Sequence, residues 1–351
     1  MLPLASKNPL VWFWSAYRLH GYILQTNVSI VHARSRAPAW VGWLATRGTP
    51  ARFVTTFHGT YGLRGGWLKR FYNSIMVAGP HVIANSSYIS DHIIDKYHIT
   101  PHRITIATRG FDETRFNPSL FSPKDRQLLR AELGIPPRTP VLFMSGRLTA
   151  WKGQHLLLEA LAKLLPIPWV AIFAGGPEGR GHYADDLKGF AHRLGLTERI
   201  RWLGHRTDIP ALLSLSTLAF STSIKPEAFG RVAVEAMAME VPIIASAHGG
   251  SLETVLDGAT GWLLPVNSRG EITPQALADC IAAALQNPAK LRTMGQRARR
   301  HVLHRFTEDQ CCQAEMTVYE RLIERQWPTI PAISLPTQSQ LNKINQAPTK
   351  K

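Results

Sequence analysis

Short apolar and β-branched runs alternate with helical patterns along the chain, and this rhythm occurs in two blocks. The first block has four β-rich runs, at 28–33, 52–58, 81–86 and 104–110. The second block begins after Pro136-Pro137 and has six such runs, at 141–146, 169–176, 200–204, 218–223, 242–246 and 261–265. Helical patterns between the runs are typical of βαβ units with parallel strands. The sequence therefore predicts an α/β fold of two doubly wound, Rossmann-like domains that face a common cleft.

The domain boundaries are expected where this rhythm stops. We expect an N-terminal domain at 1–120, a Pro-rich, polar linker at 121–139 and a C-terminal domain at 140–308. A final helix is expected at 309–326. Residues 327–351 carry four prolines among polar residues, which predicts a disordered tail.

The first block opens with a loop and a helical pattern. A doubly wound domain usually begins with a strand and a glycine-rich turn. We therefore expect the N-terminal domain to be incomplete, lacking its first strand and glycine-rich loop. Either the true start lies upstream of Met1, or the chain is a damaged and inactive copy.

Positive charge is concentrated in the first third of the chain. The formal net charge is +16, and residues 1–110 hold 12 Lys/Arg but only Asp91 and Asp95 as acids. Such asymmetry favours an anionic partner, which is nucleic acid, an acidic membrane leaflet or an anionic substrate. A generally basic proteome would give the same excess.

The cysteines and the apolar runs bear on the cellular compartment. Cys280, Cys311 and Cys312 fit no disulfide framework and no zinc spacing, which favours a reducing cytoplasm. No apolar run reaches the ~18 residues of a membrane span, and the N-terminus lacks the pattern of a signal peptide.

Candidate ligand-binding residues follow several of the predicted strands. In parallel sheets, ligands bind beyond the carboxyl ends of the strands. Arg147 and Lys152 follow the first strand of the second block, in a loop flanked by glycines that suits phosphate groups. Gly175 and Gly176 follow the next strand and permit close backbone approach. Solvated loop cations and an ordinary tight turn explain the same residues.

Two glutamates eight positions apart flank the start of a predicted helix, in KPEAFGRVAVEAMAME. Glu227 precedes the helix, Phe229 and Gly230 lie at its start, and Glu235 lies two turns inside. Eight helical residues rise roughly 12 Å, so the two carboxylates cannot hold the same atom. They suit two ends of a ligand with hydroxyls at both ends and a diphosphate between them, which is a nucleotide sugar. A charge at the start of the helix and a surface glutamate are the structural alternative.

Other strand ends supply further candidates. Gly249-Gly250 follows the run 242–246 and is a second position for phosphate or sugar contacts. In the first block, the candidates at strand ends that face the presumed cleft are His32, Arg34, His58 and Arg109, and His58 there could orient an acceptor or the donor sugar. A structural histidine explains His58 equally well.

Signature motifs of several other protein classes are absent from the sequence. It has no G-x-x-x-x-G-K-[ST] motif, no G-x-S-x-G motif and no D-x-D motif. The last absence argues against a metal-bound diphosphate, so we expect no metal ligands. Cationic side chains and helix N-termini then supply the counter-charge. No nucleic-acid-binding module is recognisable, so we expect no nucleic-acid partner.

Taken in order, these stretches resemble the retaining glycosyltransferases of family 4 (group 1), which have the GT-B fold. EAFGRVAVEAMAMEVPIIASAHGGSLETV resembles the donor-site signature, and GRLTAWKG resembles the phosphate loop. TTFHG resembles the histidine segment of the acceptor domain, and ATRGFDETRF resembles the turn before the linker. The resemblance runs from about residue 28 to about residue 325.

The resemblance implies a hexosyltransferase with a UDP- or GDP-linked donor and no other cofactor. It implies that Glu227 contacts the transferred sugar, that Glu235 holds the ribose and that Arg147 and Lys152 bind the diphosphate. The amides of Phe229 and Gly230 and the glycine pairs 175–176 and 249–250 support the donor. The implied catalytic set is Glu227, His58, Arg147 and Lys152. The family also implies retention of anomeric configuration.

The acceptor is expected to be a glycan or a lipid-linked glycan, with the core of lipopolysaccharide as one candidate. Trp12, Trp14 and Trp67 lie beside Arg64, Lys69 and Arg70 in the basic first block, and LVWFWSAYRLHGYILQ suits a membrane interface. We therefore expect a cytoplasmic protein that binds the inner face of the cytoplasmic membrane, in cell-envelope synthesis. A helix packed on its own domain explains the same segment.

Rival functions remain open from the sequence alone. A shortened, catalytically inactive homologue would still bind nucleotide sugars or glycans. A sugar-nucleotide epimerase or a phosphorylase would need acid–base carboxylates or a pyridoxal-phosphate lysine motif, and neither is recognisable.

Overall fold

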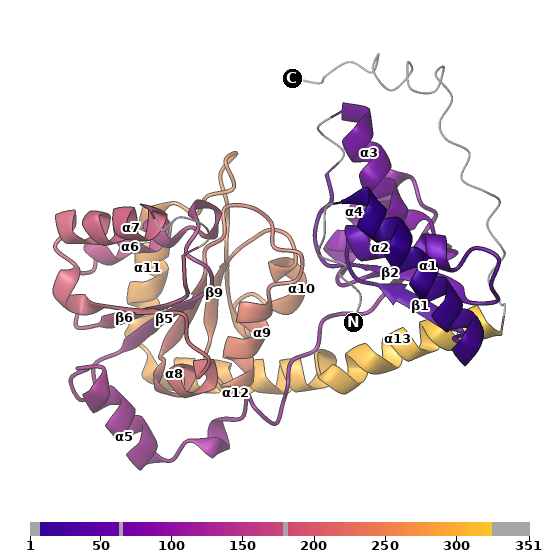
Figure 1. Cartoon of the computed structure of the whole chain (residues 1–351). Helices are drawn as coiled ribbons and strands as arrows, with labels where there is room; N and C mark the ends of the chain where they lie inside the picture. The colour runs from indigo at the N-terminus through magenta and orange to yellow at the C-terminus, as the bar shows by residue number, and fades with distance from the viewer. Residues whose placement is uncertain (1–7, 63–65, 178–181, 325–351) are drawn as a thin grey trace. The chain divides into compact units, whose positions relative to one another are not determined.

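The computed structural model of the protein describes residues 8–62, 66–177 and 182–324 (Figure 1). Contacts between residues divide these into two units. The first unit holds the described residues up to Ile83, together with His92–Thr105 and those from Met316 onward. The second unit holds Ala84–Asp91 and Ile106–Glu315. The expected disordered tail and Arg64 lie outside the described residues.

The first sheet has four strands in the order β1-β2-β3-β4. Its strands are β1 (Ile30–Ala33), β2 (Arg52–Phe57), β3 (His81–Ala84) and β4 (Ile104–Ile106). Its α-helices are α1 (Pro9–Thr26), α2 (Arg36–Ala45), α3 (Gly66–Ser74) and α4 (Ser87–Tyr97), and α13 (Glu308–Ile323) extends into this unit from the second. β1 pairs with β2 in parallel, with Ile30 opposite Arg52.

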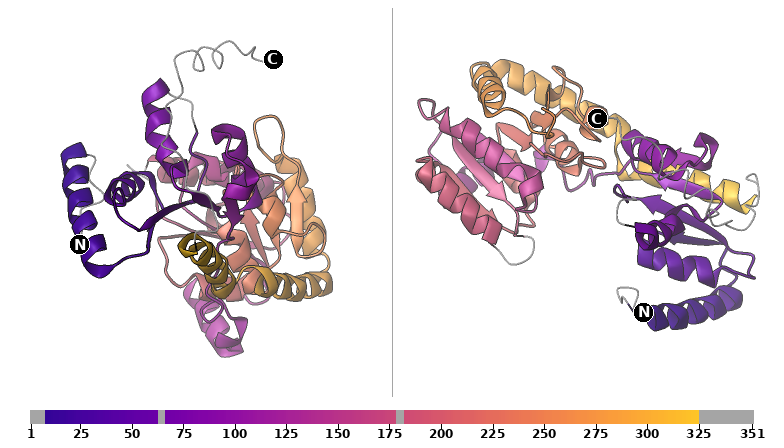
Figure 2. Two further views of the ribbon diagram at one scale, coloured as in Figure 1. Left: turned by 90° about the vertical axis from the view of Figure 1, so that its right-hand side faces the viewer. Right: turned by 90° about the horizontal axis from the view of Figure 1, so that it is seen from above.

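Helix α1 begins and ends at recognisable signals. The Asn8 side chain accepts a hydrogen bond from Leu10 N at 3.0 Å, and Pro9 occupies the first turn, where its missing N–H costs nothing. Asn27 ends the helix in the left-handed conformation. α1 lies beside α2 in the views of Figures 1 and 2, and Ala16 and Ile23 are buried in the small core that the two helices share.

The second unit is built on a six-stranded sheet in the order β10-β9-β8-β5-β6-β7. Its strands are β5 (Val141–Ser145), β6 (Val170–Ala174), β7 (Ile200–Gly204), β8 (Leu218–Ser221), β9 (Ile243–Ser246) and β10 (Gly261–Leu264). Every recorded pair in this sheet is parallel. The predicted α/β fold with two parallel sheets is confirmed.

Helices cover both faces of this second sheet (Figure 1). One face carries α6 (Gln154–Ala162), α7 (His182–Arg193) and α11 (Pro274–Leu285), and the other carries α8 (Ile209–Leu215), α9 (Arg231–Ala238) and α12 (Pro288–Arg305). Alternate residues of β5 point to opposite faces of the sheet: Leu142 packs with α6, α7 and α11, and Phe143 packs with α8, α9 and α12. The short helix α10 (Ser251–Thr254) follows β9.

The segment interpreted from its composition as a linker contains a helix, α5 (Pro123–Glu132). A capping box starts it: Ser122 Oγ accepts from Asp125 N, and Asp125 Oδ2 accepts from Ser122 N. Contacts also group residues 106–120 with the second unit, whereas the sequence suggested the first domain for them.

Candidate functional site

The strand order of the second sheet reverses between β5 and β8. β5 is the first strand of the unit, and its neighbours are β6 on one side and β8 on the other. At such a switch point the following helices leave to opposite faces, and the loops after the two strands diverge around a crevice. The loops after β5 and β8 carry Lys152 and Glu227, so the topology brings these two predicted residues together.

Backbone contacts join the two loops. Ile224 N donates to Trp151 O at 2.7 Å, and Thr222 Oγ1 donates to Gly153 O at 3.1 Å. Gly153 has φ +73°, and a Cβ there would lie 2.0 Å from Thr222 O. Only glycine allows the β5 loop to approach β8 this closely.

Lys152 and Glu227 form an ion pair across this junction. Lys152 Nζ lies 2.5 Å from Glu227 Oε1, and the two side chains are 13% and 16% exposed. The same carboxylate oxygen accepts a hydrogen bond from Ser223 Oγ at 2.6 Å. Lys152 Nζ also lies 4.4 Å from the centre of the Trp151 ring. Among the described residues, Glu227 Oε2 has no hydrogen-bond donor.

The turn after β9 packs against the Glu227 loop. Gly250 N donates to Glu227 O at 2.8 Å. Gly249 has φ +60°, and a Cβ there would lie 2.6 Å from Glu227 O, while one at Gly250 would lie 2.5 Å from Phe229 Cα. The predicted donor-binding pair Gly249-Gly250 therefore supports the position of Glu227.

His248, which directly precedes this glycine pair, contacts the loop after β8. Its Nε2 lies 2.8 Å from Ser223 O and carries the proton, because a carbonyl oxygen can only accept a hydrogen bond. The ring is half-buried, and its Nδ1 is buried without a hydrogen-bond partner among the described residues. His248 thus ties the β9 turn to the strand end from which Glu227 follows.

Helix α9 begins at Arg231, shortly after Glu227. Gly230 precedes it with φ +88°, and the first amides of the helix have no acceptor within the helix. The Phe229 side chain is buried against the Phe306 ring, with ring centres 5.4 Å apart. The side chain of Phe229 is therefore not available to a ligand, and only its main chain could make such a contact.

Glu235 lies one helical turn beyond Arg231 and pairs with it. Arg231 Nη2 donates to Glu235 Oε1 at 2.8 Å, and the Glu235 side chain is 14% exposed. Burial raises the pKa of the Glu235 carboxyl, and the Arg231 guanidinium partly opposes that rise. Glu235 and Glu227 thus form two separate ion pairs, each with its own cation.

The remaining predicted donor residues lie on the loops after β5 and β6. Arg147 is exposed. A Cβ at Gly175 would lie 1.8 Å from Gly146 O, and Leu148 N donates to Gly176 O at 2.9 Å. The glycines 175 and 176 thus hold the β5 loop, which is a structural role that the sequence also allowed.

In the first unit, His32 is held by two hydroxyl groups. Its Nδ1 lies 2.6 Å from the hydroxyl of Tyr319 on α13, and its Nε2 lies 2.6 Å from Thr56 Oγ1. Burial, with Arg34 and His58 nearby, lowers the pKa of His32 to about 4. His32 is therefore neutral at pH 7, and neither ring nitrogen is left for an acceptor.

The other acceptor-side candidates differ in exposure. Arg34 is exposed, and His58 is half-buried directly after β2. Arg109 belongs to the second unit and precedes Gly110, where a Cβ would lie 2.5 Å from Glu308 Cα.

Ser223, His248 and Trp151 were not among the residues predicted to form the site. Ser223 lies four residues before Glu227 at the end of a strand, which is the one local signal that pointed to it. The contacts of His248 and Trp151 depend on loop conformations that no spacing encodes.

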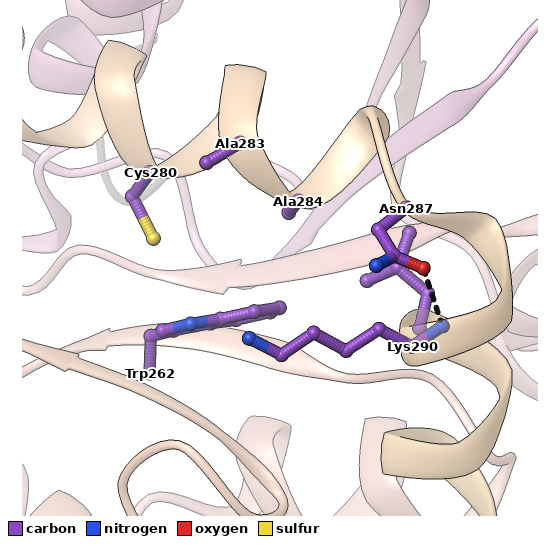
Figure 3. A pocket seen from close by; sticks show the side chains of 7 residues that line it. Trp262, Cys280, Ala283, Ala284, Asn287 and Lys290 are labelled. Atoms are coloured by element: carbon purple, nitrogen blue, oxygen red, sulfur yellow. Dashed lines mark hydrogen bonds between the residues drawn. The ribbon is translucent and has the colours of Figure 1, made fainter.

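A separate cavity of about 140 Å³ lies between β10, α11 and α12 (Figure 3). Trp262, Cys280 and Lys290 line it, and none of its lining residues belongs to the loops described above. Burial raises the pKa of the Cys280 thiol to about 11, and Asp257 adds to the rise. The thiol is therefore protonated and weakly nucleophilic at neutral pH.

The described part of the chain holds neither a metal-binding cluster nor a membrane-spanning helix. No group of three or more His, Cys, Asp or Glu side chains within it is placed to hold a metal ion. None of the described helices combines the length and the apolar character that crossing a bilayer requires.

Known proteins resemble this chain in sequence. It is 31% identical over 256 residues to a D-inositol 3-phosphate glycosyltransferase of Mycobacterium sp. (strain KMS). That alignment covers 69% of this chain and 56% of the relative, so the chain spans little more than half the length of this curated relative.

Solved structures resemble it in fold. A glycosyltransferase from Rickettsia africae matches with a TM-score of 0.83 and 32% identity, over 91% of this chain and 83% of that chain. HepE of Anabaena, in complex with UDP-glucose, matches with a TM-score of 0.77 and 28% identity, over 88% and 82% of the two chains.

Family models match both parts of the chain. Residues 1–115 match the model described as Glycosyltransferase Family 4, and residues 125–301 match Glycosyl transferases group 1. The chain therefore belongs to the group 1 glycosyltransferases and has their GT-B fold.

Proposed function

We propose that the protein transfers a sugar from a UDP- or GDP-linked donor to a glycan or lipid-linked acceptor, with retention of configuration and without a metal ion. The observation that carries the proposal is the Lys152–Glu227 pair at the switch point of the second sheet. It places a cation and a carboxylate side by side, as a diphosphate joined to a sugar requires. The UDP-glucose complex of HepE supports a nucleotide-sugar partner.

Each group of the site has a part in this reaction. Arg147, Lys152 and the first amides of α9 neutralise the diphosphate. Glu227 Oε2 accepts a hydrogen bond from a sugar hydroxyl, and Glu235 accepts hydrogen bonds from the ribose. The helix amides are fixed by the fold, so they need little reorganisation as negative charge develops on the leaving group.

The bonds and the proton of this transfer are accounted for without an external base. The bond between the anomeric carbon and the β-phosphate oxygen breaks, and the acceptor oxygen forms a new bond to the same carbon. The acceptor proton passes to the departing phosphate. His58 is the candidate for orienting the reacting sugar, and Arg34 and Arg109 are candidates for binding the acceptor.

A panel of UDP- and GDP-hexoses tests the donor assignment. We expect Glu227→Gln to lower kcat/KM by about 100-fold or more, because it removes a charged acceptor of a sugar hydroxyl. Glu198→Gln, at an exposed glutamate of the same unit, is the control. Unchanged transfer by Glu227→Gln would refute the role of Glu227, and a shortened, inactive binding protein would show no transfer by the wild type.

We also propose that the first unit binds an anionic membrane surface. On α1, Leu10, Phe13 and Tyr17 are 75%, 62% and 79% exposed and recur on one helical face. On α3, Trp67 is 70% exposed. Residues 1–90 contain no Asp or Glu, so the aromatic face lies in a unit whose charge complements acidic lipids.

Liposome flotation tests the membrane proposal. Wild type is expected to float with vesicles containing an acidic phospholipid at low salt, and the double variant Phe13→Ser/Tyr17→Ser is expected to lose most of that binding. Leu128→Ser, at a leucine 61% exposed on α5, is the matched control. Equal flotation of all three proteins would refute the assignment.

The proposed acceptor class follows from the same charge. It is a lipid-attached glycan at the cytoplasmic membrane face, with lipopolysaccharide core as one candidate. The name of the mycobacterial relative suggests a phosphorylated polyol as the competing acceptor. Transfer to inositol 3-phosphate but to no lipid-linked glycan would favour the competitor.

A further inference from the structure

We propose that Ser223 and His248 are positioning residues that hold the Glu227 carboxylate when the donor draws Lys152 away. The proposal rests on the proposed function, and it concerns two residues for which no role was predicted. An asymmetry in the hydrogen bonding of the Glu227 carboxylate supports it.

Both hydrogen bonds to that carboxylate reach the same oxygen. Lys152 Nζ and Ser223 Oγ lie 2.5 and 2.6 Å from Oε1. Oε2 has no donor among the described residues. A carboxylate held through one oxygen presents the other in a fixed direction, so Oε2 is the oxygen that faces a sugar hydroxyl.

The two donors differ in what else they do. Lys152 carries a mobile ammonium group, which a bound diphosphate attracts more strongly than a single carboxylate does. The Ser223 hydroxyl has no competing partner in the described part of the chain, and this residue is 2% exposed just after β8. In the donor complex, the bond from the Ser223 hydroxyl is therefore the one that continues to fix Glu227.

His248 holds Ser223 from the other side. Its Nε2–H donates to Ser223 O at 2.8 Å, and the adjoining glycine turn packs on the Glu227 backbone. The imidazole therefore fixes the main chain from which the Ser223 hydroxyl projects. Support of this kind around a ligand-contacting residue limits its rotation in the bound state.

The experiment compares nucleotide and nucleotide-sugar binding in Ser223→Ala. Calorimetry measures the affinities for UDP and UDP-glucose, or for GDP and a GDP-hexose if the wild type binds guanine nucleotides. We expect the UDP affinity to stay within twofold of wild type, while the sugar-dependent gain in affinity and kcat fall about tenfold, which equals about 1.4 kcal/mol. Ser223→Thr, which keeps the hydroxyl, is expected to recover most of the loss.

A double-mutant cycle separates positioning from folding. In the Glu227→Gln background, Ser223→Ala is expected to change nucleotide-sugar binding by less than twofold, because the group that it positions has changed. His248→Leu is expected to resemble Ser223→Ala, whereas Ser214→Ala, which removes a local helix hydrogen bond, serves as the control.

Three results would overturn the proposal. The first is unchanged nucleotide-sugar binding in Ser223→Ala, and the second is an equal loss of UDP and UDP-glucose affinity. The third is an equally strong effect of Ser223→Ala in the Glu227→Gln background. Failure of the wild type to bind any nucleotide would instead refute the proposed function, and the positioning role with it.

Discussion

Replacing Gly153 by alanine tests the close approach that joins the loops after β5 and β8. The left-handed φ of +73° costs an alanine about 1 kcal/mol. Its Cβ would also lie 2.0 Å from Thr222 O, so the two loops must separate by about 1 Å to restore van der Waals contact. That shift weakens or breaks the hydrogen bonds Ile224 N–Trp151 O and Thr222 Oγ1–Gly153 O, each worth about 1 kcal/mol. We expect Gly153→Ala to lower the free energy of unfolding by about 3 kcal/mol.

Urea unfolding measures this loss, and Gly195→Ala is the matched control. Gly195 has nearly the same φ, +72°, but no atom of the described residues lies within 4 Å of the position of its Cβ. It should therefore lose only the backbone contribution of about 1 kcal/mol. Because Lys152 precedes Gly153, only Gly153→Ala should also weaken UDP binding. Equal losses of stability in the two variants would refute the argument from the close contact.

Three further predictions concern titratable groups. Burial raises the pKa of the Cys280 thiol to about 11, so Cys280 should react with iodoacetamide at pH 8 far more slowly than the exposed Cys312. Peptide mass spectrometry measures the two rates, and equal rates would contradict this prediction. Burial lowers the pKa of His81 to about 4, so between that value and the ordinary 6.5 the unfolded chain binds a proton that the folded chain does not. Urea titrations should show this group lowering stability by about 2 kcal/mol from pH 7 to pH 5, with a smaller fall in His81→Gln. Because the pKa of Glu235 is raised, nucleotide affinity should begin to weaken at a higher pH on acidification than it would with an ordinary carboxyl group. The nucleotide affinity of Glu235→Gln, measured by calorimetry, should lack this pH dependence.

The strands and the loops that follow them could be predicted because their signals are local. Apolar runs of the right length mark buried strands, and the ends of parallel strands collect the residues that bind ligands. Lys152 and Glu227 were therefore recognisable as parts of one site. Their direct pairing could not be predicted, because it depends on hydrogen bonds between two loops that lie 70 residues apart in sequence.

Other features were hidden for different physical reasons. Helix α5 has a readable capping box at Ser122, but its polar, Pro-flanked sequence also suits a linker. The partner of His32 is Tyr319, which is 287 positions away, and no periodicity reports such a contact. A strand-end histidine therefore looked available to an acceptor although the fold already uses both of its nitrogens.

The contact between His32 and Tyr319 has a consequence for how this protein can be divided or recombined. The first unit is formed by segments on both sides of the second unit in the sequence, because its described residues from Met316 onward follow the last residue of the second unit. An exchange that imported a different first unit from residues 1–120 alone would leave the new β1 without its matching helix. A chimera that exchanges the first unit is therefore expected to fold only if the segment from Met316 is exchanged together with the N-terminal segment, and not through a single crossover.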